Sequence, residues 1–406
     1  MMQTAEPSAA KIRVCHIITL LELGGAQQNT LYTSAHLDRR RFEVSLVAGP
    51  GGLLDDEARS IPFMQTHWIP ELVREVSPTR DFVALLKLTA LMRRLQPDLV
   101  HTHSSKAGIL GRWAAHLAGV GAVVHTVHGF GFHPAMPFFK RQWFRTLETW
   151  TAPLTTRFLA VSQANLDCAV RSGIFPPGRA SLIRSGVELA AFRNGARRGS
   201  LRTELKIPSD APVVGMVGCL KPQKAPVDFV KVAAEVSRRV AGAHFLLVGD
   251  GELRGAVERE VVQHSLAGRF HLLGWRRDIP SLFKNIDVLA LTSLWEGLPR
   301  VVPEAMAASL PVVATRVDGT PEAVVEGETG FLVEPGDVSA MADKISWLLE
   351  HPEVARSMGL KGRERVGEFD IDLMVDRLEA LYESLLSEET GARPRAGGAA
   401  SYGGED

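Results

Sequence analysis

The chain has 406 residues, a length that predicts two or three domains, each large enough to bury its own hydrophobic core. Hydrophobic residues make up 45% and charged residues 23%, and this composition excludes wholesale disorder. Lys plus Arg and Asp plus Glu both number 46, so no global basic field points to a nucleic-acid partner. The three cysteines, Cys15, Cys168 and Cys219, are too scattered for a disulfide framework and favour the cytoplasm.

The chain carries no sequence signal for insertion into a membrane. Its first ten residues, MMQTAEPSAA, lack the basic start and the apolar run of a secretion signal. No apolar stretch reaches the ~18 residues that a spanning helix needs. A role at the membrane would therefore be peripheral.

Short apolar runs alternate with longer helix-compatible stretches from Ile12 to about Val187, as in IRVCHIITL, DLVHTH and VVHTVHG. The alternation restarts after 194–210, a Gly- and charge-rich connection, in VVGMVG, HFLLVGDG and DVLALTS. Strands that alternate with helices predict a parallel sheet covered on both faces. The sequence therefore predicts the α/β class, with doubly wound parallel-sheet domains over 11–190 and 210–365 that face a central cleft.

Two further segments follow the second domain. Residues 366–387 contain apolar positions at helical spacing in IDLMVDRLEALYESLLS, which predicts a terminal helix that can pack back on the N-terminal domain. Residues 388–406 are rich in Gly and Ala and predict a disordered tail, because they offer little apolar surface to bury.

The first strand, HIITL, runs into ELGGAQQNT, which places Gly24 and Gly25 in the first strand-to-helix turn. Paired glycines there let backbone N–H groups approach a phosphate or sugar at a helix N-terminus. The spacing does not match the G-x-G-x-x-G dinucleotide fingerprint, and such a pair is equally compatible with a simple tight turn.

Two loops of the second domain are candidates for binding an anion. The strand VVGMVG ends at CLKPQKAP, from which Lys224 could reach a diphosphate, although a solvated surface lysine is the ordinary alternative. The strand HFLLV ends in an open turn that contains Gly251. That turn also needs no ligand to explain it.

The most informative stretch is TSLWEGLPRVVPEAM, in which Glu296 and Glu304 are eight residues apart. Eight helical steps of ~100° would set them ~80° out of register, so a shared target requires Glu296 in the loop before the helix. Pro299 and Pro303 agree with a helix start at this point. Two carboxylates near a helix N-terminus are also favourable without any ligand.

Four histidines, His101, His103, His125 and His128, cluster at the ends of two neighbouring strands. No pair has H-x-x-x-H spacing or a cysteine partner, so we expect no metal there. His128, which precedes a glycine at the strand exit, is the best placed to touch a ligand, whereas His125 alternates with it and is suited to packing.

Taken in this order, these residues resemble those of retaining glycosyltransferases with the GT-B fold, specifically glycosyltransferase family 4. The resemblance runs from about Lys11 to Ser387 and rests on GGAQ, HTVHGF, AVS, RSGVE, the Lys224 loop and the E-x7-E motif with AMAASLPVVATRVDGTPE. It implies two Rossmann-like domains that close over the cleft. The C-terminal domain would hold a nucleotide-sugar donor, and the N-terminal domain would present the acceptor.

The resemblance also implies roles for the charged residues of the C-terminal domain. Glu304 matches the residue that binds the nucleotide ribose, Glu296 the residue that binds a donor-sugar hydroxyl, and Lys224 the residue that binds the diphosphate. The family needs no divalent metal and no other cofactor, because positive side chains and helix N-termini stabilise the departing diphosphate.

On the N-terminal side, the resemblance implies that Gly24 and Gly25 make backbone contacts near the leaving group, and that His128 lies by the sugar. It further implies retention of the anomeric configuration. In that mechanism the acceptor attacks from the front face and the leaving phosphate takes its proton.

Two departures from the family pattern concern the donor site. The phosphate loop reads G-C-L-K-P-Q-K-A, so Cys219 replaces the usual Arg, and E-G-L-P-R replaces E-G-F-G-L, so Pro299 removes an amide. We expect Lys221 or Arg300 to replace the diphosphate contact that is missing at Cys219. For the amide lost at Pro299, Arg300 is the natural substitute, because it is cationic where charge develops.

The segment 137–150, PFFKRQWFRTLETW, sets Phe139, Trp143, Leu147 and Trp150 within one ~80° arc of a helix, which is typical of a core-facing stripe. Its remaining aromatic residues lie among cations, as in a helix at a membrane surface. Both interpretations stay open: a core helix, or peripheral contact with the inner face of the plasma membrane.

The resemblance makes the chain a cytoplasmic glycosyltransferase that uses a saccharide or polyprenyl-linked acceptor in cell-surface polysaccharide assembly. Two alternatives remain, a sugar-nucleotide 2-epimerase of the same fold and a non-catalytic sugar-nucleotide-binding subunit, because one fold hosts many functions. The nucleotide base, the sugar and the linkage are not encoded in these motifs.

Overall fold

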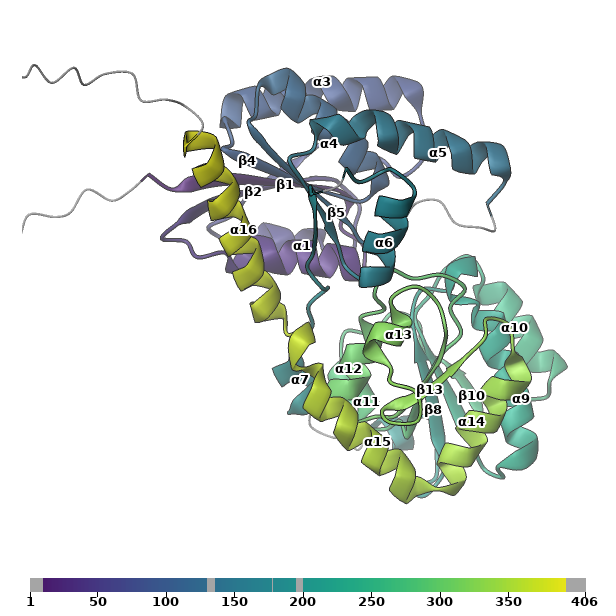
Figure 1. Cartoon of the computed structure of the whole chain (residues 1–406). Helices are drawn as coiled ribbons and strands as arrows, with labels where there is room; N and C mark the ends of the chain where they lie inside the picture. Colours follow the sequence, from purple (N-terminus) through teal and green to yellow (C-terminus); the bar gives the residue numbers. More distant parts are fainter. Residues whose placement is uncertain (1–9, 130–135, 177, 195–199, 392–406) are drawn as a thin grey trace, which may run out of the picture.

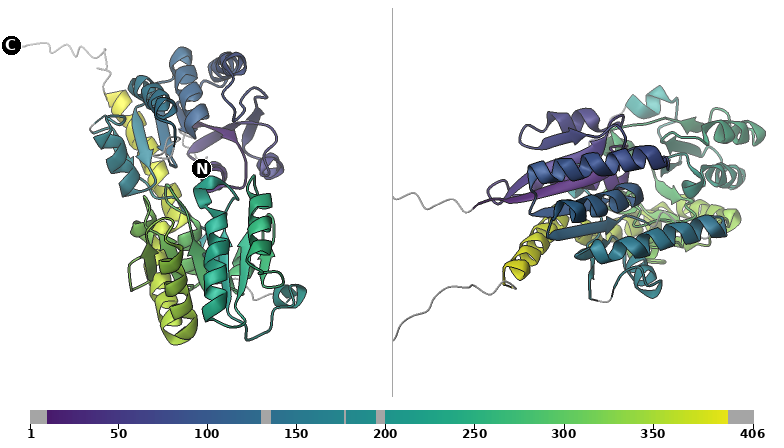
Figure 2. Two further views of the ribbon diagram at one scale, coloured as in Figure 1. Left: turned by 90° about the vertical axis from the view of Figure 1, so that its right-hand side faces the viewer. Right: turned by 90° about the horizontal axis from the view of Figure 1, so that it is seen from above.

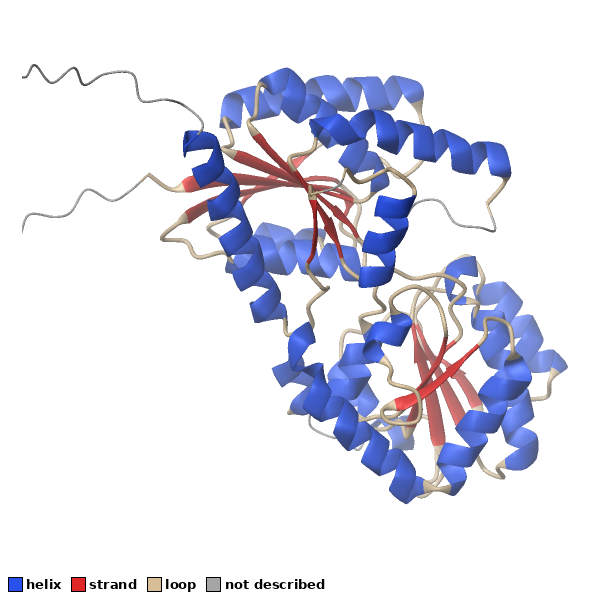
Figure 3. Ribbon diagram, viewed as in Figure 1, coloured by secondary structure: helices blue, strands red, loops and turns tan. Residues whose placement is uncertain are grey.

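The computed structural model describes residues 10–129, 136–176, 178–194 and 200–391. It contains two α/β domains, in each of which helices cover both faces of a parallel sheet (Figures 1 and 3). This arrangement confirms the predicted class of two doubly wound parallel-sheet domains.

The N-terminal domain is built on a seven-stranded sheet with the order β3-β2-β1-β4-β5-β6-β7. All of its neighbouring strands pair in parallel. Because the strand order reverses between β1 and β4, the loops that follow these two strands open a crevice at the carboxyl edge of the sheet. The strands are β1 (Ile12–Leu20), β2 (Phe42–Gly49), β3 (Gln65–Trp68), β4 (Leu99–His103), β5 (Ala122–Val127), β6 (Arg157–Ala160) and β7 (Ala180–Leu182).

Helices bury apolar side chains on both faces of this sheet. On one face, α3 and α4 contribute Leu88 and Ala115 to the core. On the other face, α1 and the terminal helix α16 contribute Leu31 and Leu378. The helices of this domain, with the terminal one, are α1 (Gly25–His36), α2 (Asp55–Ser60), α3 (Pro78–Leu95), α4 (Ser105–Ala118), α5 (Phe138–Thr151), η1 (Ala152–Leu154), α6 (Gln163–Arg171) and α16 (Ile371–Gly391).

The C-terminal domain repeats the plan with a six-stranded sheet of order β10-β9-β8-β11-β12-β13. Its strands are also parallel. The order reverses between β8 and β11, so a second crevice opens beside the loops that follow these strands. The strands are β8 (Val213–Val217), β9 (His244–Val248), β10 (Phe270–Leu272), β11 (Val288–Leu291), β12 (Val312–Thr315) and β13 (Gly330–Val333).

The C-terminal core includes residues on the N-terminal side of position 210, where the sequence analysis begins this domain. Val187, Phe192 and Leu201 are buried in the same cluster as the C-terminal strands. The connection between the domains is therefore partly a packed element of the second one. The helices of this domain are α7 (Leu189–Arg193), α8 (Ser200–Glu204), η2 (Pro222–Lys224), α9 (Pro226–Arg239), α10 (Arg254–Gln263), α11 (Ile279–Phe283), α12 (Val301–Ala307), α13 (Thr320–Ala323), α14 (Val338–Glu350), α15 (Pro352–Arg365) and η3 (Val366–Phe369).

The chain crosses between the domains twice, and the two crossings lie side by side. The Val187 N–H donates to the Phe369 carbonyl at 2.8 Å, and the Ile371 N–H donates to the Val187 carbonyl at 3.1 Å. Helix α16 then runs back along the N-terminal domain, as Figure 1 and the left view of Figure 2 show. It continues to Gly391, so the first residues of the predicted tail are helical, and 392–406 lie outside the described residues.

Helix α5 corrects the interpretation of its aromatic stripe as core. Phe139 is 85% exposed, Trp143 62% and Trp150 71%. The buried face of α5 is instead polar: Glu148 accepts a bond of 2.6 Å from Arg112, a residue with no exposed surface. Because a buried guanidinium needs a carboxylate partner, the helix turns its polar side inward and its aromatic side outward.

Candidate functional site

A cleft of about 740 Å³ lies between the two domains, where the crevices of the two sheets face each other. Two residues that the sequence analysis assigns to donor binding, Lys221 and Gly251, lie outside its lining. The other seven line it together: Gly24, Gly25, His128, Lys224, Glu296, Arg300 and Glu304.

Lys224 and Glu296 form an ion pair in the lining of the cleft. Lys224 ends η2 after β8, and Glu296 follows the neighbouring strand β11, so the carboxyl ends of two adjacent parallel strands bring them together. The Lys224 ammonium contacts Oε1 of Glu296, and the Ser293 hydroxyl donates to the same oxygen at 2.6 Å. As the spacing requires, Glu296 lies in the loop, whereas Glu304 lies on α12.

The Glu296 loop is held by a second carboxylate. The Glu296 backbone N–H donates to Oδ2 of Asp318 at 2.6 Å. Burial raises the pKa of Asp318, the bond from the Glu296 amide opposes that shift, and the nearby Glu296 charge adds to it. Glu296 is only 7% exposed, so its side chain is held in one place before any ligand arrives.

Arg300 links the two domains across the cleft. It caps the start of α12, and its Nη1 donates to Oε1 of Gln28 on α1 of the other domain. Its Nη2 lies 3.7 Å from Oε1 of Glu304, one turn further along α12. Burial lowers the pKa of Arg300, and the negative charge of Glu304 opposes this shift. Burial raises the pKa of Glu304, and the positive charge of Arg300 opposes that shift.

The glycine turn lies directly beside Arg300. Gly24 caps the N-terminus of α1, whose free N–H groups open toward the cleft. A Cβ added to Gly25 would lie 3.0 Å from Cδ of Arg300, so a side chain there would push the guanidinium away. The backbone of this turn and a cation from the other domain are thus side by side.

Neighbouring structure explains why Gly251 and Lys221, which we expected to bind the donor, lie outside the cleft. Gly251 packs against the neighbouring loop, where an added Cβ would lie 2.7 Å from the Leu220 carbonyl oxygen, and Gly249 lines the cleft in its place. Lys221 caps the start of η2 and stays out of the cleft. Of the two substitutes for the missing phosphate-loop Arg, only Arg300 reaches the cleft that Cys219 lines.

His128 enters the cleft from the end of β5, close to the Glu296 loop. Its carbonyl oxygen would be 2.0 Å from a Cβ added to Gly297, so the two domains touch through backbone at this point. Burial, aided by the Arg300 charge, lowers the pKa of His128 to about 4, so its imidazole is neutral at pH 7.

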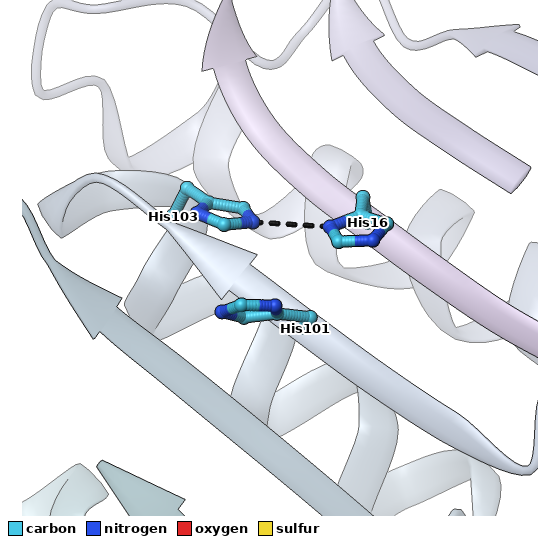
Figure 4. Close-up of side chains that lie close together, drawn as sticks. All are labelled: His16, His101 and His103. Atoms are coloured by element: carbon cyan, nitrogen blue, oxygen red, sulfur yellow. Dashed lines mark hydrogen bonds between the residues drawn. The ribbon is translucent and has the colours of Figure 1, made fainter. Parts of the chain in front are cut away.

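Three buried histidines, His16, His101 and His103, bring ring nitrogens within 4.8 Å of one another, a spacing that a metal ion could use (Figure 4). Both nitrogens of His101 are already bonded, to the Tyr382 hydroxyl at 2.5 Å and to the Thr126 hydroxyl at 2.7 Å. The centroids of the His101 and His103 rings lie only 4.1 Å apart, with the ring planes tilted by 36°. The geometry fits a hydrogen-bonded cluster better than a metal centre.

The sequence analysis missed several residues that line or support the cleft: Gln28, Glu188, Arg276, Arg277 and Asp318. Gln28 had a usable signal, because it follows Gly24 by one helical turn and so shares its face. The others lie in loops where no local pattern separates a ligand contact from an ordinary surface charge.

Two family models match the chain, one in each domain. The model of glycosyltransferase family 4 matches residues 23–191, and the model of the group 1 glycosyl transferases matches residues 198–365. The boundary between the matches lies at the chain's first crossing between the two domains.

Relatives and solved structures agree with these matches. A UDP-Gal:alpha-D-GlcNAc-diphosphoundecaprenol alpha-1,3-galactosyltransferase of Escherichia coli is 33% identical over 386 residues, which cover 93% of this chain and 98% of the relative. The capsular polysaccharide biosynthesis glycosyltransferase CapM of Staphylococcus aureus is 25% identical, over 87% of this chain and 93% of the relative.

The crystal structure of HepE from Anabaena in complex with UDP and glucose superposes with a TM-score of 0.79 and 20% identity, over 92% of this chain and all of the other. Sucrose-phosphate synthase from Thermosynechococcus elongatus gives a TM-score of 0.81 at 23% identity, over 93% and 100% of the two chains. With a matched model in each domain and a 33% identical relative along nearly its whole length, the chain belongs to glycosyltransferase family 4 and has the GT-B fold.

Proposed function

We propose that this glycosyltransferase moves a sugar from a nucleotide-diphosphate-sugar to a lipid-linked saccharide, with retention of anomeric configuration, in cell-surface polysaccharide assembly. The observation that carries the proposal is the largely buried Lys224–Glu296 ion pair, which lines a cleft between two doubly wound α/β domains. The name of the Escherichia coli relative specifies UDP-galactose and a diphosphoundecaprenol-linked acceptor, so UDP-sugars are the donors to test first.

In this proposal the donor lies along the carboxyl edge of the C-terminal sheet. Glu304 accepts bonds from the ribose hydroxyls, because burial on α12 leaves its carboxylate with few partners besides Arg300. Glu296 accepts a bond from a sugar hydroxyl. Lys224, released in part from Glu296, turns to the diphosphate and brings a positive charge to it.

The leaving diphosphate gains negative charge as the glycosidic bond breaks. Lys224, Arg300 and the N-terminus of α1 at Gly24 and Gly25 line the place where that charge develops. Preorganised positive groups in a partly dry cleft are the main source of catalysis in such a reaction. This chain therefore supplies the electrostatic role that a divalent metal plays elsewhere, and we propose that it works without one.

The acceptor approaches from the N-terminal domain and attacks the anomeric carbon from the face that the diphosphate leaves. Its hydroxyl proton passes to the departing phosphate oxygen, so no separate base is required. The neutral His128 lies beside the Glu296 loop, where it can hold a sugar or phosphate oxygen.

The test is release of nucleoside diphosphate in EDTA from a panel of UDP-, GDP- and ADP-sugars, with and without a membrane-lipid extract. We expect release from one donor only when the extract is present, and a loss of about a hundredfold in kcat/KM in Lys224→Met and Glu296→Gln. The matched control is Lys231→Met, which removes an ammonium on α9 that lies outside the cleft.

Two outcomes would overturn the proposal. Interconversion of UDP-sugars without an acceptor would assign the chain as a 2-epimerase. Nucleotide binding without turnover in the presence of an active lipid extract would make it a non-catalytic subunit. The anomeric proton coupling of the product, read by NMR, tests retention separately.

We further propose that α5 contacts the inner face of the membrane that carries the acceptor. None of the described helices combines the length and hydropathy needed to cross a bilayer. Helix α5 exposes Phe138, Phe139, Trp143 and Trp150, and the Arg141 guanidinium lies 5.9 Å from the Phe138 ring. Aromatic side chains among cations are typical of a helix that lies in a membrane interface.

Flotation with phosphatidylglycerol vesicles at low salt tests this contact. We expect the wild type to float, and the double variant Phe139→Ser/Trp143→Ser to remain in the dense fraction. Trp347→Ser is the control, because Trp347 is exposed to a lesser extent on α14 of the other domain. Equal flotation of the double variant and the wild type would remove α5 from the contact.

A further inference from the structure

Three histidines form a hydrogen-bonded chain from the interior of the N-terminal sheet to the cleft. Nδ1 of His16, on β1, lies 3.1 Å from Nε2 of His103, at the end of β4, as the dashed line in Figure 4 marks. Nδ1 of His103 lies 3.1 Å from Nε2 of His128, which follows β5. Neighbouring parallel strands thus place the three rings in one line.

All three imidazoles are neutral at pH 7. Burial lowers the pKa of His16 to about 3 and that of His128 to about 4, and it lowers the pKa of His103 well below its ordinary value. A neutral imidazole has one N–H donor and one bare acceptor nitrogen. The protons of the chain are therefore coupled, and only two arrangements make both hydrogen bonds.

The arrangements differ at the two ends of the chain. Nε2 of His16 and Nδ1 of His128 are both buried and have no hydrogen-bond partner among the described residues. In one arrangement Nε2 of His16 carries a proton and Nδ1 of His128 is bare. In the other, Nδ1 of His128 carries the proton and Nε2 of His16 is bare.

The surroundings of the two ends choose between these arrangements. His16 lies on β1 inside the sheet, against His101 and Tyr382, where no ligand can reach it. An N–H at its Nε2 would stay unpaired, and unpaired buried N–H groups are the rarer and costlier case. His128, in contrast, is only partly buried and lines the cleft, so its end of the chain is the one that a ligand can approach.

We propose that His16 and His103 are positioning residues that fix His128 as the Nδ1–H tautomer, so that it presents a hydrogen-bond donor to the ligand in the cleft. In this chain His16 donates from Nδ1 to His103, and His103 donates from Nδ1 to His128. Whether one ring nitrogen carries the proton is set by the hydrogen bond that the other nitrogen makes. Here His16 sets the tautomer of His103, and His103 sets that of His128.

The consequence for the reaction rests on the proposed function. A nucleotide-diphosphate-sugar presents oxygens, from its phosphates and its sugar hydroxyls, all of which accept hydrogen bonds. A bare nitrogen of His128 could not bond a phosphate oxygen, because both atoms are hydrogen-bond acceptors. An N–H of His128 can donate to any of these oxygens. The chain therefore prepares the cleft for an acceptor-rich ligand without placing a second full charge beside Arg300.

The direct test is NMR of the full chain labelled with ¹⁵N in its histidines, at pH 7 and without substrate. Long-range ¹H–¹⁵N correlations distinguish the two neutral tautomers and the cation, and single substitutions assign the signals. We expect His16, His103 and His128 to carry their proton on Nδ1. An Nε2–H tautomer or a cation at His103 or His128 would overturn the proposal.

A pair of variants tests the transmission from His103. The side-chain amide of His103→Asn can still donate to His128, whereas His103→Leu cannot. We expect His128 to keep its Nδ1 proton in the first variant and to populate Nε2–H, the ordinary preference of the imidazole, in the second. The same tautomer of His128 in both variants would show that His103 does not position it.

These readouts are separate from the test of the proposed function. If no donor releases nucleotide but His128 holds its proton on Nδ1, the proposed function fails and the positioning chain stands. If sugar transfer occurs, His103→Leu is expected to lower kcat/KM about tenfold and His103→Asn to retain most of it, because one hydrogen bond to a charged ligand is lost only in the former.

Discussion

Lowering the pH from 7 to 5 is expected to destabilise the N-terminal domain through its buried histidines. Burial lowers the pKa of His16 to about 3 and that of His128 to about 4, whereas a histidine in an unfolded chain titrates near 6.5. A base with a lowered pKa binds fewer protons in the folded state than in the unfolded state. Stability is therefore full above about pH 6.5 and falls as the pH drops toward the folded-state values.

The size of the effect follows from these values. At pH 5, about 1.5 units below the unfolded pKa, each histidine that stays neutral in the fold costs about 2 kcal/mol, because one pH unit corresponds to about 1.4 kcal/mol. Burial lowers the pKa of His101, His103 and His125 in the same direction, so they add to the loss.

Urea unfolding of the wild type and of His16→Leu at both pH values isolates one histidine. We expect the free energy of unfolding of the variant to fall by about 2 kcal/mol less than that of the wild type between pH 7 and 5. His116→Leu, which replaces an exposed histidine on α4, is the control and should follow the wild type. Identical pH dependence in His16→Leu and the wild type would refute the reasoning from burial.

Three other substitutions test the packing and charge of the cleft and of α5. Arg112→Leu leaves the Glu148 carboxylate buried and unpaired, so it should lower the free energy of unfolding in urea by ~3–5 kcal/mol. The double variant Arg112→Leu/Glu148→Leu should recover most of that loss, and equal stability of the two variants would contradict this. Gly297→Ala places a Cβ 2.0 Å from the His128 carbonyl oxygen, so small-angle scattering should report a more open pair of domains, and an unchanged radius of gyration would contradict it. Cys219→Arg adds a cation to the cleft and should tighten UDP binding about tenfold by calorimetry. Unchanged affinity would contradict this and would mean that Arg300 already supplies the charge.

The meeting of Lys224 and Glu296 could be predicted in part from the sequence. Each follows a run of apolar residues that forms a buried strand, and the carboxyl ends of parallel strands share one edge. The pairing of β8 with β11 has no local signal, because it depends on the whole strand order. The strand pattern therefore indicates the edge of the sheet on which both side chains lie, whereas their contact depends on the strand order.

The turn at Gly251 and the histidine chain show where local patterns fail. Gly249 and Gly251 both have positive φ, so the sequence indicates a turn but not which glycine faces the cleft. The close approach of the Leu220 carbonyl decides this. His16 and His103 are 87 residues apart, and only the pairing of β1 with β4 makes them neighbours.

Helix α5 shows why a periodic pattern does not reveal which face of a helix is buried. Its aromatic residues share one arc, as predicted, and hydrophobic burial alone would turn that arc inward. The orientation of α5 depends instead on α4, where Arg112 has no exposed surface and makes a charged contact with Glu148 of α5. Leaving that guanidinium unpaired would cost about 3–5 kcal/mol, so its contact with Glu148 fixes the side of α5 that faces α4. The outward aromatic face is then exposed beside Arg141, and this is the surface that we propose for contact with a membrane interface.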